Sequence, residues 1–487
     1  MLAFPGRPES TSLTTMPVID GELVSSWSSH IDVLDPSTGA TVATVPDVGA
    51  EGVDRAVRSA TRAMGSWGAM APRDRSAHLL RLADAVAAHA DDLVAIEALD
   101  VGKPVRLVPA EVASAVDKIR FYAGAARQLS GLAANEYRPP LTSFVRRDPV
   151  GVVAALTPWN YPLAMAVWKV GPALAAGNTV VLKPSPETPL STLRFAEIAA
   201  QILPPGVLNV VTGGIQVGQA LVTHEDVAMV SLTGGTATGK AVMSAAASSL
   251  KRLHLELGGN ASVLIFNDAD LDKLRDSYFM AAFRNTGQDC HAASRVYAAP
   301  EIVDDVVDII RSVAETSPVG DPFDPGVLVG PLVSRDQHSR ITRMVEDALS
   351  HPYIERVTHT DVPSTDGFYF PLTVLKNVRH DDVITQDEIF GPVVTVSAFS
   401  DEKDAIRRAN GVSQGLAASI WTGGIDRALR ISKQLKVGTV WINTHGETVA
   451  EMPFGGMKES GFGRDLSIYS MEQHTDLKHI AIHVSDA

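Results

Sequence analysis

From residue 151 onward, short apolar runs alternate with segments of helical periodicity. The run GVVAAL at 151–156 predicts a buried strand, AMAVWKVGPALAAG at 164–177 predicts a helix, and TVVLKP at 179–184 predicts the next strand. The alternation continues with a helix over 189–201, a strand over 208–211, a helix over 216–222, a strand over 227–232 and a helix over 236–248. This order favours a parallel sheet covered by helices, and such sheets bind ligands at the carboxyl ends of their strands.

A second alternating block runs from about 258 to 460. Its predicted elements are strands at 261–266, 393–399 and 438–443, and helices near 270–283, 300–315, 334–348 and 402–410. Upstream of both blocks, residues 51–66 and 73–99 show helical periodicity. Two α/β blocks in one chain predict a cleft between them.

The composition narrows the possible binding partners. The 487 residues are 45% hydrophobic and 20% charged, which is typical of a globular protein, and a net charge of −14 disfavours nucleic acid as a partner.

The sequence also indicates where the protein is located. The single cysteine excludes internal disulfides and fits a reducing compartment, so we expect a cytoplasmic protein. We expect no membrane span, because no stretch of about 20 apolar residues is uninterrupted. The N-terminal segment 1–16 lacks the features of a signal peptide and predicts a loose tail.

Cys290, the only cysteine, lies in the segment NTGQDCHAASR. A lone cysteine is usually an inert, buried small hydrophobe. The polar, glycine-bearing GQDC instead predicts a loop, and a thiol on a loop at a helix start can ionise and attack an electrophile. The residues that follow predict a helix or the start of a strand. His291 is a candidate base, although the side chain of an adjacent residue often points elsewhere.

Two further motifs carry groups suited to catalysis. Glu256, in HLELGGN, lies in an apolar strand that ends in two glycines, which indicates a backbone brought close to a ligand rather than a surface carboxylate. A carboxylate in a partly apolar site has a raised pKa and can act as a general base. Asn160 lies between two prolines in TPWNYP, so its amide either caps the turn or is held ready to donate to an oxyanion.

Two segments that bear glycine or lysine suit nucleotide contacts. The strand ending in Lys183 (LKPSPETP) and the strand–turn–helix SLTGGTATG at 231–239 suit phosphate or ribose groups at the edge of a sheet. A G-x-G-x-x-G fingerprint is missing, since TGGIQVG at 212–218 does not fit it. The glycine-rich loop at 442–465 has the length of a functional loop. No metal-type spacing of Cys and His is present, so we expect no metal site.

Taken together, these motifs resemble the aldehyde dehydrogenase superfamily over residues 20–480. The resemblance rests on the order and spacing of TPWNYP, LKPS, LTGGTATG, LELGG, GQDCHAASR, EIFGPV, WINT and PFGGMKESGFGR. It implies a Rossmann-like dinucleotide-binding domain (1–129 and 150–257), an α/β catalytic domain (258–460) and a small β oligomerisation arm with the C-terminal segment (130–149 and 461–487). A homodimer or homotetramer is then expected.

The resemblance also implies the roles of the site residues. Cys290 attacks the aldehyde, the Asn160 amide and the Cys290 N–H hold the oxyanion, Glu256 activates the hydrolytic water, and Lys169 supports the site. NAD is the implied cofactor. Its implied contacts are Trp159, Lys183, Ser185, Gly213, Gly214, Thr233, Gly234, Gly235, Leu257, Gln337, Glu388 and Phe390.

Departures from the family pattern leave NADP open as an alternative cofactor. Pro186 stands where many members carry a glutamate that contacts the adenosine ribose, and Glu187 is one position further on. Gly235 replaces a usual serine and opens the same region. Without the usual carboxylate, a 2′-phosphate meets less repulsion.

Within the superfamily the chain looks closest to γ-aminobutyraldehyde dehydrogenases, which predicts an ω-aminoaldehyde such as 4-aminobutyraldehyde as substrate. A cationic end group requires carboxylates and aromatic faces. The expected substrate contacts are Tyr161, Met165, Trp168, Glu111 and Phe454. General aliphatic, aromatic or betaine-type aldehydes remain alternatives. A CoA-acylating semialdehyde dehydrogenase is disfavoured by Glu256, and a non-catalytic member by the retention of Cys290, Glu256 and Asn160.

Overall fold

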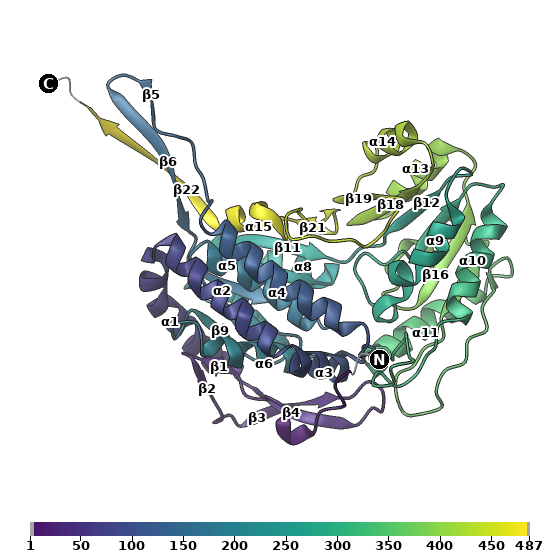
Figure 1. Cartoon of the computed structure of the whole chain (residues 1–487), viewed down its shortest axis with the longest axis horizontal. Coiled ribbons are helices and arrows are strands. Elements are labelled where there is room, and N and C mark those ends of the chain that lie inside the picture. The colour runs from purple at the N-terminus through teal and green to yellow at the C-terminus, as the bar shows by residue number, and fades with distance from the viewer. Residues whose placement is uncertain (1–3, 485–487) are drawn as a thin grey trace.

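The computed structural model describes residues 4–484, and the first half of the chain is arranged around an eight-stranded sheet (Figure 1). The strand order is β2-β1-β9-β8-β7-β10-β11-β21, and the five strands from β9 to β11 are mutually parallel. Antiparallel strands close both edges. The strands are β1 (Val18–Ile19), β2 (Glu22–Leu23), β7 (Val152–Leu156), β8 (Thr179–Lys183), β9 (Leu208–Val210), β10 (Val227–Gly234), β11 (Arg252–Leu257) and β21 (Gly461–Phe462).

Helices cover both faces of this sheet, as the alternating sequence predicts. Val152 and Ala154 of β7 pack into one hydrophobic cluster, whereas Val153 and Ala155 pack into the other. The first face is covered by α1 (Gly49–Ala69), α7 (Ile215–Thr223) and α8 (Thr236–Ala246). The second is covered by α5 (Pro162–Ala175) and α6 (Leu190–Ala200), with α2 (Pro72–Ala88), α3 (Ala90–Val101) and α4 (Val108–Ala125) packed beyond them.

The prediction of one continuous helix over 73–99 is wrong. The chain leaves helical geometry at His89 (φ −107°, ψ 21°), which separates α2 from α3. The His89 ring bonds the carbonyl oxygen of Ala85 at 2.8 Å. A side chain bonded to the backbone of the last turn competes with continued helix.

The second half is arranged around a seven-stranded sheet of order β14-β15-β16-β13-β12-β18-β19, parallel except at β14. Its strands are β12 (Ser262–Ile265), β13 (Arg295–Ala298), β14 (Glu355–Arg356), β15 (Thr373–Lys376), β16 (Val393–Ala398), β18 (Ala417–Trp421) and β19 (Thr439–Ile442). Its helices are α9 (Leu271–Tyr278), α10 (Val303–Glu315), α11 (Arg335–Leu349), α12 (Val383–Gln386), α13 (Glu402–Asn410) and α14 (Ile425–Ser432). The helix predicted near 270–283 changes at Phe279 into a π-helical turn that ends at Phe283.

A three-stranded antiparallel sheet extends away from the body (Figure 1). It consists of β5 (Asn135–Arg138), β6 (Leu141–Pro149) and β22 (Thr475–His483), with β6 in the middle. These strands lie within the two segments predicted to form an arm. The division into domains at residues 257 and 460 stays a prediction.

The remaining short elements connect these units. They are the hairpin β3 (Ser29–Leu34) and β4 (Thr41–Asp47), the pair β17 (Gln414–Gly415) and β20 (Met457–Lys458), and α15 (Ser467–Gln473). Within residues 4–484, every helix is too short or too polar to cross a bilayer. The loose tail expected before Met16 is instead tied down from residue 4 onward, because Arg7 pairs with Asp35 and Asp321 and Phe4 packs against the core.

Candidate active site

A cavity of about 1050 Å³ lies where the two blocks meet, as the predicted cleft requires. The last residues of four parallel strands line it from one side: Leu156, Lys183, Gly234 and Leu257. Residues of the second block line the other side. The predicted site residues that line the cavity are Cys290, Glu256, Asn160, Trp159, Lys183, Ser185, Gly214, Thr233, Gly234, Gly235, Leu257, Gln337, Glu388, Phe390, Tyr161, Met165, Trp168, Glu111 and Phe454. Two predicted residues, Lys169 and Gly213, lie behind its wall.

Cys290 lies in a turn that leads into β13. The predicted loop is therefore confirmed, and of the two predicted continuations, a helix or the start of a strand, the structure has the strand. Left-handed backbone at Asn285 (φ 49°) and Thr286 (φ 57°) folds the preceding segment back toward the cavity. Because a strand follows, the thiol gains no stabilisation from a helix N-terminus.

The surroundings of Cys290 favour the neutral thiol. Burial raises the pKa of the Cys290 thiol well above its usual value, and the carboxylates of Glu256 and Asp289 raise it further. Charge on sulfur is disfavoured both by desolvation and by nearby negative groups. Attack on an electrophile therefore requires a partner that takes up the thiol proton.

His291 turns back toward Cys290, contrary to the expectation for an adjacent residue. Its Nδ1 lies 3.7 Å from Cys290 Sγ and 2.8 Å from Asp289 Oδ1, and His445 Nε2 lies 2.6 Å from the His291 carbonyl oxygen. Burial alone would raise the pKa of Asp289, but the His291 ring and the Arg284 guanidinium hold it well below its usual range. The imidazole thus lies between a carboxylate and the thiol.

The same three residues form a compact set of donor atoms. One side-chain atom each of Asp289, Cys290 and His291 lies within 4.8 Å of the other two, which is close enough to hold a metal ion. The expectation that the chain has no metal site stays a prediction, because close donor atoms alone do not show that an ion binds. Sequence-spacing rules describe ligands separated by turns of a helix or loop, and they do not capture three consecutive side chains that fold together.

Glu256 occupies the penultimate position of β11, with only 2% of its surface exposed. Burial raises its pKa to about 8, and the nearby Lys169 ammonium opposes the rise. Among the described residues, no group hydrogen-bonds Glu256 Oε1. A carboxyl group of this kind can accept a proton near neutral pH, as a general base requires.

The two glycines after β11 permit close approach of protein groups. A Cβ at Gly258 would lie 2.1 Å from Glu388 Oε2, and one at Gly259 would lie 2.1 Å from the Cys290 carbonyl oxygen. Gly259 N–H donates to Glu388 Oε1 at 2.8 Å. The two glycines therefore let the end of β11 pack closely against Glu388 and the cysteine loop. The sequence had indicated close approach of a ligand at this position.

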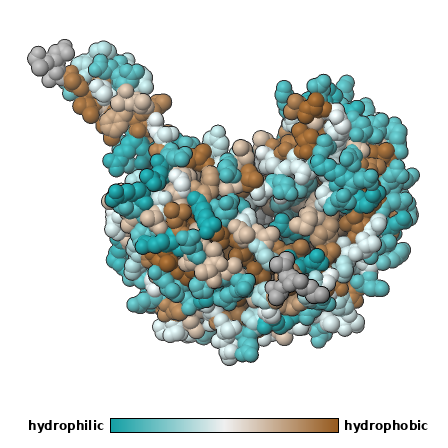
Figure 2. All heavy atoms as spheres, in the orientation of Figure 1, coloured by the Kyte–Doolittle hydropathy of each residue, from teal (hydrophilic) through white to brown (hydrophobic). Residues whose placement is uncertain are grey.

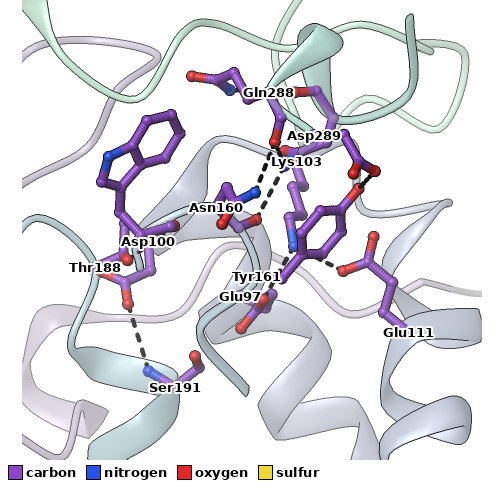
Figure 3. Close-up of polar contacts among 12 residues, drawn as sticks. Glu97, Asp100, Lys103, Glu111, Asn160, Tyr161, Thr188, Ser191, Gln288 and Asp289 are labelled. Carbon is purple, nitrogen blue, oxygen red and sulfur yellow. Dashed lines mark hydrogen bonds and ion pairs between the residues drawn. The ribbon is translucent and has the colours of Figure 1, made fainter. Parts of the chain in front are cut away.

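Asn160 and Tyr161 connect the TPWNYP turn to the cysteine loop (Figure 3). Asn160 Nδ2 donates to the Gln288 carbonyl oxygen at 3.0 Å, so the amide reaches across the cavity floor instead of capping its own turn. Tyr161 O–H donates to Asp289 Oδ2 at 2.7 Å. Both side chains are buried, which fixes the loop that carries Cys290.

Lys169 does not reach the cavity. It is fully buried in α5, and its Nζ pairs with Asp465 Oδ2 at 2.7 Å. Its ammonium lowers the pKa of Glu256 against the effect of burial. Lys169 therefore acts on the site through charge and not through contact.

The dinucleotide end of the cavity is polar. Burial lowers the pKa of Lys183 to about 8, and the carboxylates of Glu187 and Asp47 oppose this. Ser185 donates to the exposed carboxylate of Glu187, which also lines the cavity. A Cβ at Gly235, before α8, would meet no atom within 4 Å. Open space beside a helix N-terminus suits a phosphate group.

The remaining predicted nucleotide contacts have distinct surroundings. A Cβ at Gly213 would lie 2.3 Å from Val217 Cγ2, so this glycine serves packing, while Gly214 reaches the cavity. Phe390 has left-handed backbone (φ 54°) and meets the Trp159 ring edge-on at 5.2 Å. Burial raises the pKa of Glu388 to about 7. Gln337 accepts from Arg340 Nε at 2.8 Å.

The opposite end of the cavity is lined by aromatic rings. Trp168 and Phe454 meet edge-on at 5.7 Å, and Tyr161 and Met165 extend the apolar wall. Glu111, the predicted acid for a cationic substrate, is already paired: its oxygens lie 2.7 Å from Lys103 Nζ and 3.0 Å from Arg284 Nη2. Both oxygens of this carboxylate already pair with a cation, so its charge is neutralised before any cationic substrate binds.

Sequence reasoning missed five residues around the site: Lys103, Lys118, Arg284, Asp289 and His445. Lys103 bridges Glu97 and Glu111 (Figure 3), and Lys118 and Arg284 line the cavity. Asp289 was visible in the GQDC motif and His445 in the WINTH motif. Arg284 has no local signal, because its partner Glu111 is 173 residues away in sequence. The partners of Lys103 and Lys118 lie within eight residues of them, but no motif in the sequence marks these lysines.

A buried carboxyl, an amide and a cysteine meet at a cavity at the edge of a parallel sheet, an arrangement typical of an enzyme. Residues 23–480 match the model of the aldehyde dehydrogenase family. The chain is 41% identical to phenylacetaldehyde dehydrogenase from Pseudomonas fluorescens over 478 residues, which covers 96% of this chain and 95% of that protein. It belongs to the aldehyde dehydrogenase family.

Two betaine aldehyde dehydrogenases support this assignment. The protein from Sinorhizobium fredii is 38% identical over 473 residues, covering 95% of this chain and 96% of that protein. The structure of the Staphylococcus aureus enzyme in complex with NAD+ superposes with a TM-score of 0.94 at 34% identity, covering 98% of this chain and 96% of that chain. The fold prediction is confirmed. The names of these relatives give no support to the predicted γ-aminobutyraldehyde subtype.

Proposed function

We propose that the protein oxidises an aldehyde to a carboxylic acid with NAD, through a thiohemiacetal and a thioester on Cys290. The observation that carries the proposal is the convergence of Cys290, Glu256 and Asn160 on one cavity beside a dinucleotide-type sheet edge. The amide and the carboxyl come from the first α/β block, whereas the thiol comes from the second.

The side chains suggest the following order of events. Cys290 Sγ bonds to the aldehyde carbon as the thiol proton leaves to a nearby base, for which His291 and Glu256 are candidates. The Asn160 amide and the Cys290 N–H hold the oxyanion. Bound NAD supplies the hydride acceptor. Glu256 then takes a proton from the water that attacks the thioester, which releases the acid and restores the thiol.

NAD is the proposed cofactor in preference to NADP. Several solved relatives, including the S. aureus enzyme, contain NAD+. Glu187 lines the cavity beside Ser185, one position after the residue that the resemblance aligns with the adenosine-ribose contact. A carboxylate there repels a 2′-phosphate.

We propose that the preferred aldehyde is aromatic and carries no positive charge at the end remote from the aldehyde, in place of an ω-aminoaldehyde. The wall formed by Trp168, Phe454, Tyr161 and Met165 suits a planar ring. Glu111 is paired, and Lys118 and Arg284 add positive charge to the cavity wall. Phenylacetaldehyde, the substrate that names the P. fluorescens relative, fits this description.

A homodimer or homotetramer assembled through the β5–β6–β22 arm is proposed as the working state. The arm carries exposed apolar side chains at Tyr137, Leu477 and Ile482. A thiol nucleophile needs a reducing compartment, so the cytoplasm is the proposed location.

The deciding experiment measures NADH production from phenylacetaldehyde, betaine aldehyde, 4-aminobutyraldehyde and an alkanal, with no CoA present. We expect the wild type to be active and Cys290→Ala to be inactive while still binding NAD in calorimetry. Turnover by the alanine variant would refute the role of the thiol, and strict dependence on CoA would favour the acylating alternative. A wild type inactive on the whole panel would support the non-catalytic alternative.

A further inference from the structure

Lys118 is a buried cation that lines the cavity without a carboxylate partner. It lies in α4, and 3% of the residue is exposed. Its one hydrogen bond within residues 4–484 runs from Nζ to Ser114 Oγ at 2.5 Å. Asp117, Glu451 and Arg284 act on it only at longer range. Burial lowers the pKa of this ammonium.

The other buried lysines show that a buried ammonium group normally pairs with a carboxylate. Lys103 bridges Glu97 and Glu111, and Lys169 pairs with Asp465; both lie outside the cavity wall. The two buried lysines that line the cavity, Lys183 and Lys118, have only uncharged oxygen partners among the described residues. A buried charge without compensation is costly, so a lysine of this kind indicates a ligand that completes it.

The position of Lys118 indicates which part of a bound ligand its ammonium group would meet. Five residues of α4 line the cavity: Ala110, Glu111, Ser114, Ala115 and Lys118. Their spacing of three and four residues places them on one face of the helix. Lys118 Nζ lies 5.8 Å from the centroid of the Trp168 ring, whose other neighbour is Phe454. The ammonium therefore lies beside the aromatic wall, away from the sheet edge that carries Lys183.

We infer that Lys118 binds an acceptor oxygen at the end of the substrate remote from the aldehyde. The substrate class is then an aromatic aldehyde that carries a carboxylate or a hydroxyl group on its ring. The apolar wall would hold the ring, and the lysine would donate to the oxygen. This inference rests on the proposed function and narrows its substrate.

The test compares phenylacetaldehyde with its 4-hydroxy and 4-carboxy derivatives in the wild type and in Lys118→Met. Methionine keeps most of the buried volume and removes the charge. A hydrogen bond to a charged group contributes about 1.5–3 kcal/mol, so KM for the oxygen-bearing substrates should rise about 10- to 100-fold. We expect kcat to stay within about twofold, and KM for phenylacetaldehyde to stay or fall. If KM rises for the 4-carboxy derivative alone, Lys118 recognises a carboxylate. If KM rises for both derivatives, Lys118 also recognises a hydroxyl oxygen.

Two controls keep the result interpretable. Lys240→Met removes an exposed lysine that pairs with Glu459 and should leave all three KM values unchanged. Melting temperature and NAD binding report whether Lys118→Met folds, and Lys118→Arg should retain most of the preference. An equal effect of Lys118→Met on all three aldehydes, or a wild type with no preference for the derivatives, would overturn the inference while leaving aldehyde oxidation intact. Loss of turnover of every aldehyde by the wild type would instead refute the proposed function.

Discussion

Glu256 is a residue whose protonation state limits its chemistry. Its pKa of about 8, raised by burial, means that the carboxyl is largely protonated at neutral pH. A general base works only in its deprotonated form. We predict that thioester hydrolysis, followed in single turnovers, accelerates with pH up to about 8 and then levels off. Glu256→Gln should keep the rapid acylation phase but lose this pH-dependent hydrolysis; equal losses in both phases would show that Glu256 only shapes the site.

The same residue makes a prediction about stability. An acid whose folded-state pKa is raised binds its proton more tightly in the folded than in the unfolded chain. The contribution of Glu256 to stability therefore falls as the pH rises from 4.5, the ordinary pKa of a glutamate, to about 8, its pKa in the folded chain. Above about pH 8 the contribution is constant. Glu256→Gln removes this loss. We expect the variant to melt above the wild type, with a difference that grows between pH 5 and about pH 8; a difference independent of pH would contradict the buried acid.

At the residue scale, we expect Glu187 to influence the choice between NAD and NADP. Its exposed carboxylate borders the cavity beside Ser185 and Lys183. Glu187→Gln removes a negative charge without shortening the side chain, so repulsion of a 2′-phosphate should fall. We predict that the ratio of kcat/KM for NADP to that for NAD rises by about tenfold, which corresponds to about 1.4 kcal/mol. An unchanged ratio would place the adenosine ribose elsewhere.

At the scale of elements, the corner between α3 and α4 is held by a buried ion cluster. Lys103 Nζ lies 3.0 Å from Glu97 Oε1 and 2.7 Å from Glu111 Oε2, and all three side chains are buried (Figure 3). Lys103→Met would leave the buried Glu97 carboxylate unpaired and would leave Glu111 with Arg284 alone. Breaking a buried pair costs about 3–5 kcal/mol. We expect a loss of that size in denaturant unfolding, against less than about 1 kcal/mol for the exposed Lys240→Met; equal losses would show that the cluster is not stabilising.

The regular elements were predictable because each is encoded locally. Val152 and Ala154 face one helical layer and Val153 and Ala155 the other, so β7 reads as a continuous apolar run. The break at His89 and the π-helical turn after Tyr278 interrupt patterns that remain periodic. Periodicity reports which face is buried and does not report where the backbone leaves helical geometry.

Residues of the site could be predicted only where they lie in a recognisable sequence motif. Cys290, Glu256 and Asn160 lie in motifs and line one cavity. Glu111 pairs with Lys103, eight residues away, and with Arg284, 173 residues away in sequence, and no local pattern reveals the second contact. For this reason a carboxylate that looked free to bind an amine in the sequence is neutralised in the fold.

At the scale of the whole molecule, the β5–β6–β22 arm has a strand edge that pairs with no other strand of the described residues. The β5–β6–β22 sheet projects from the body, with apolar side chains along its length (Figures 1 and 2). In the sheet order, β22 pairs on one side only, with β6. A long strand with a free edge and exposed apolar residues pairs readily with another chain unless it is protected.

A second copy of this chain is the simplest cover for that edge, because most soluble oligomers are symmetric assemblies of one chain. We predict that light scattering after size exclusion gives a mass of two or four times 51.7 kDa. Leu477→Asp combined with Ile482→Asp should lower the mass toward one chain, since buried apolar contacts become charged. Leu250→Asp is the matched control, because Leu250 is also exposed but lies after α8, outside the arm. A wild type that elutes as a monomer, or a control that dissociates equally, would show that the arm does not mediate assembly.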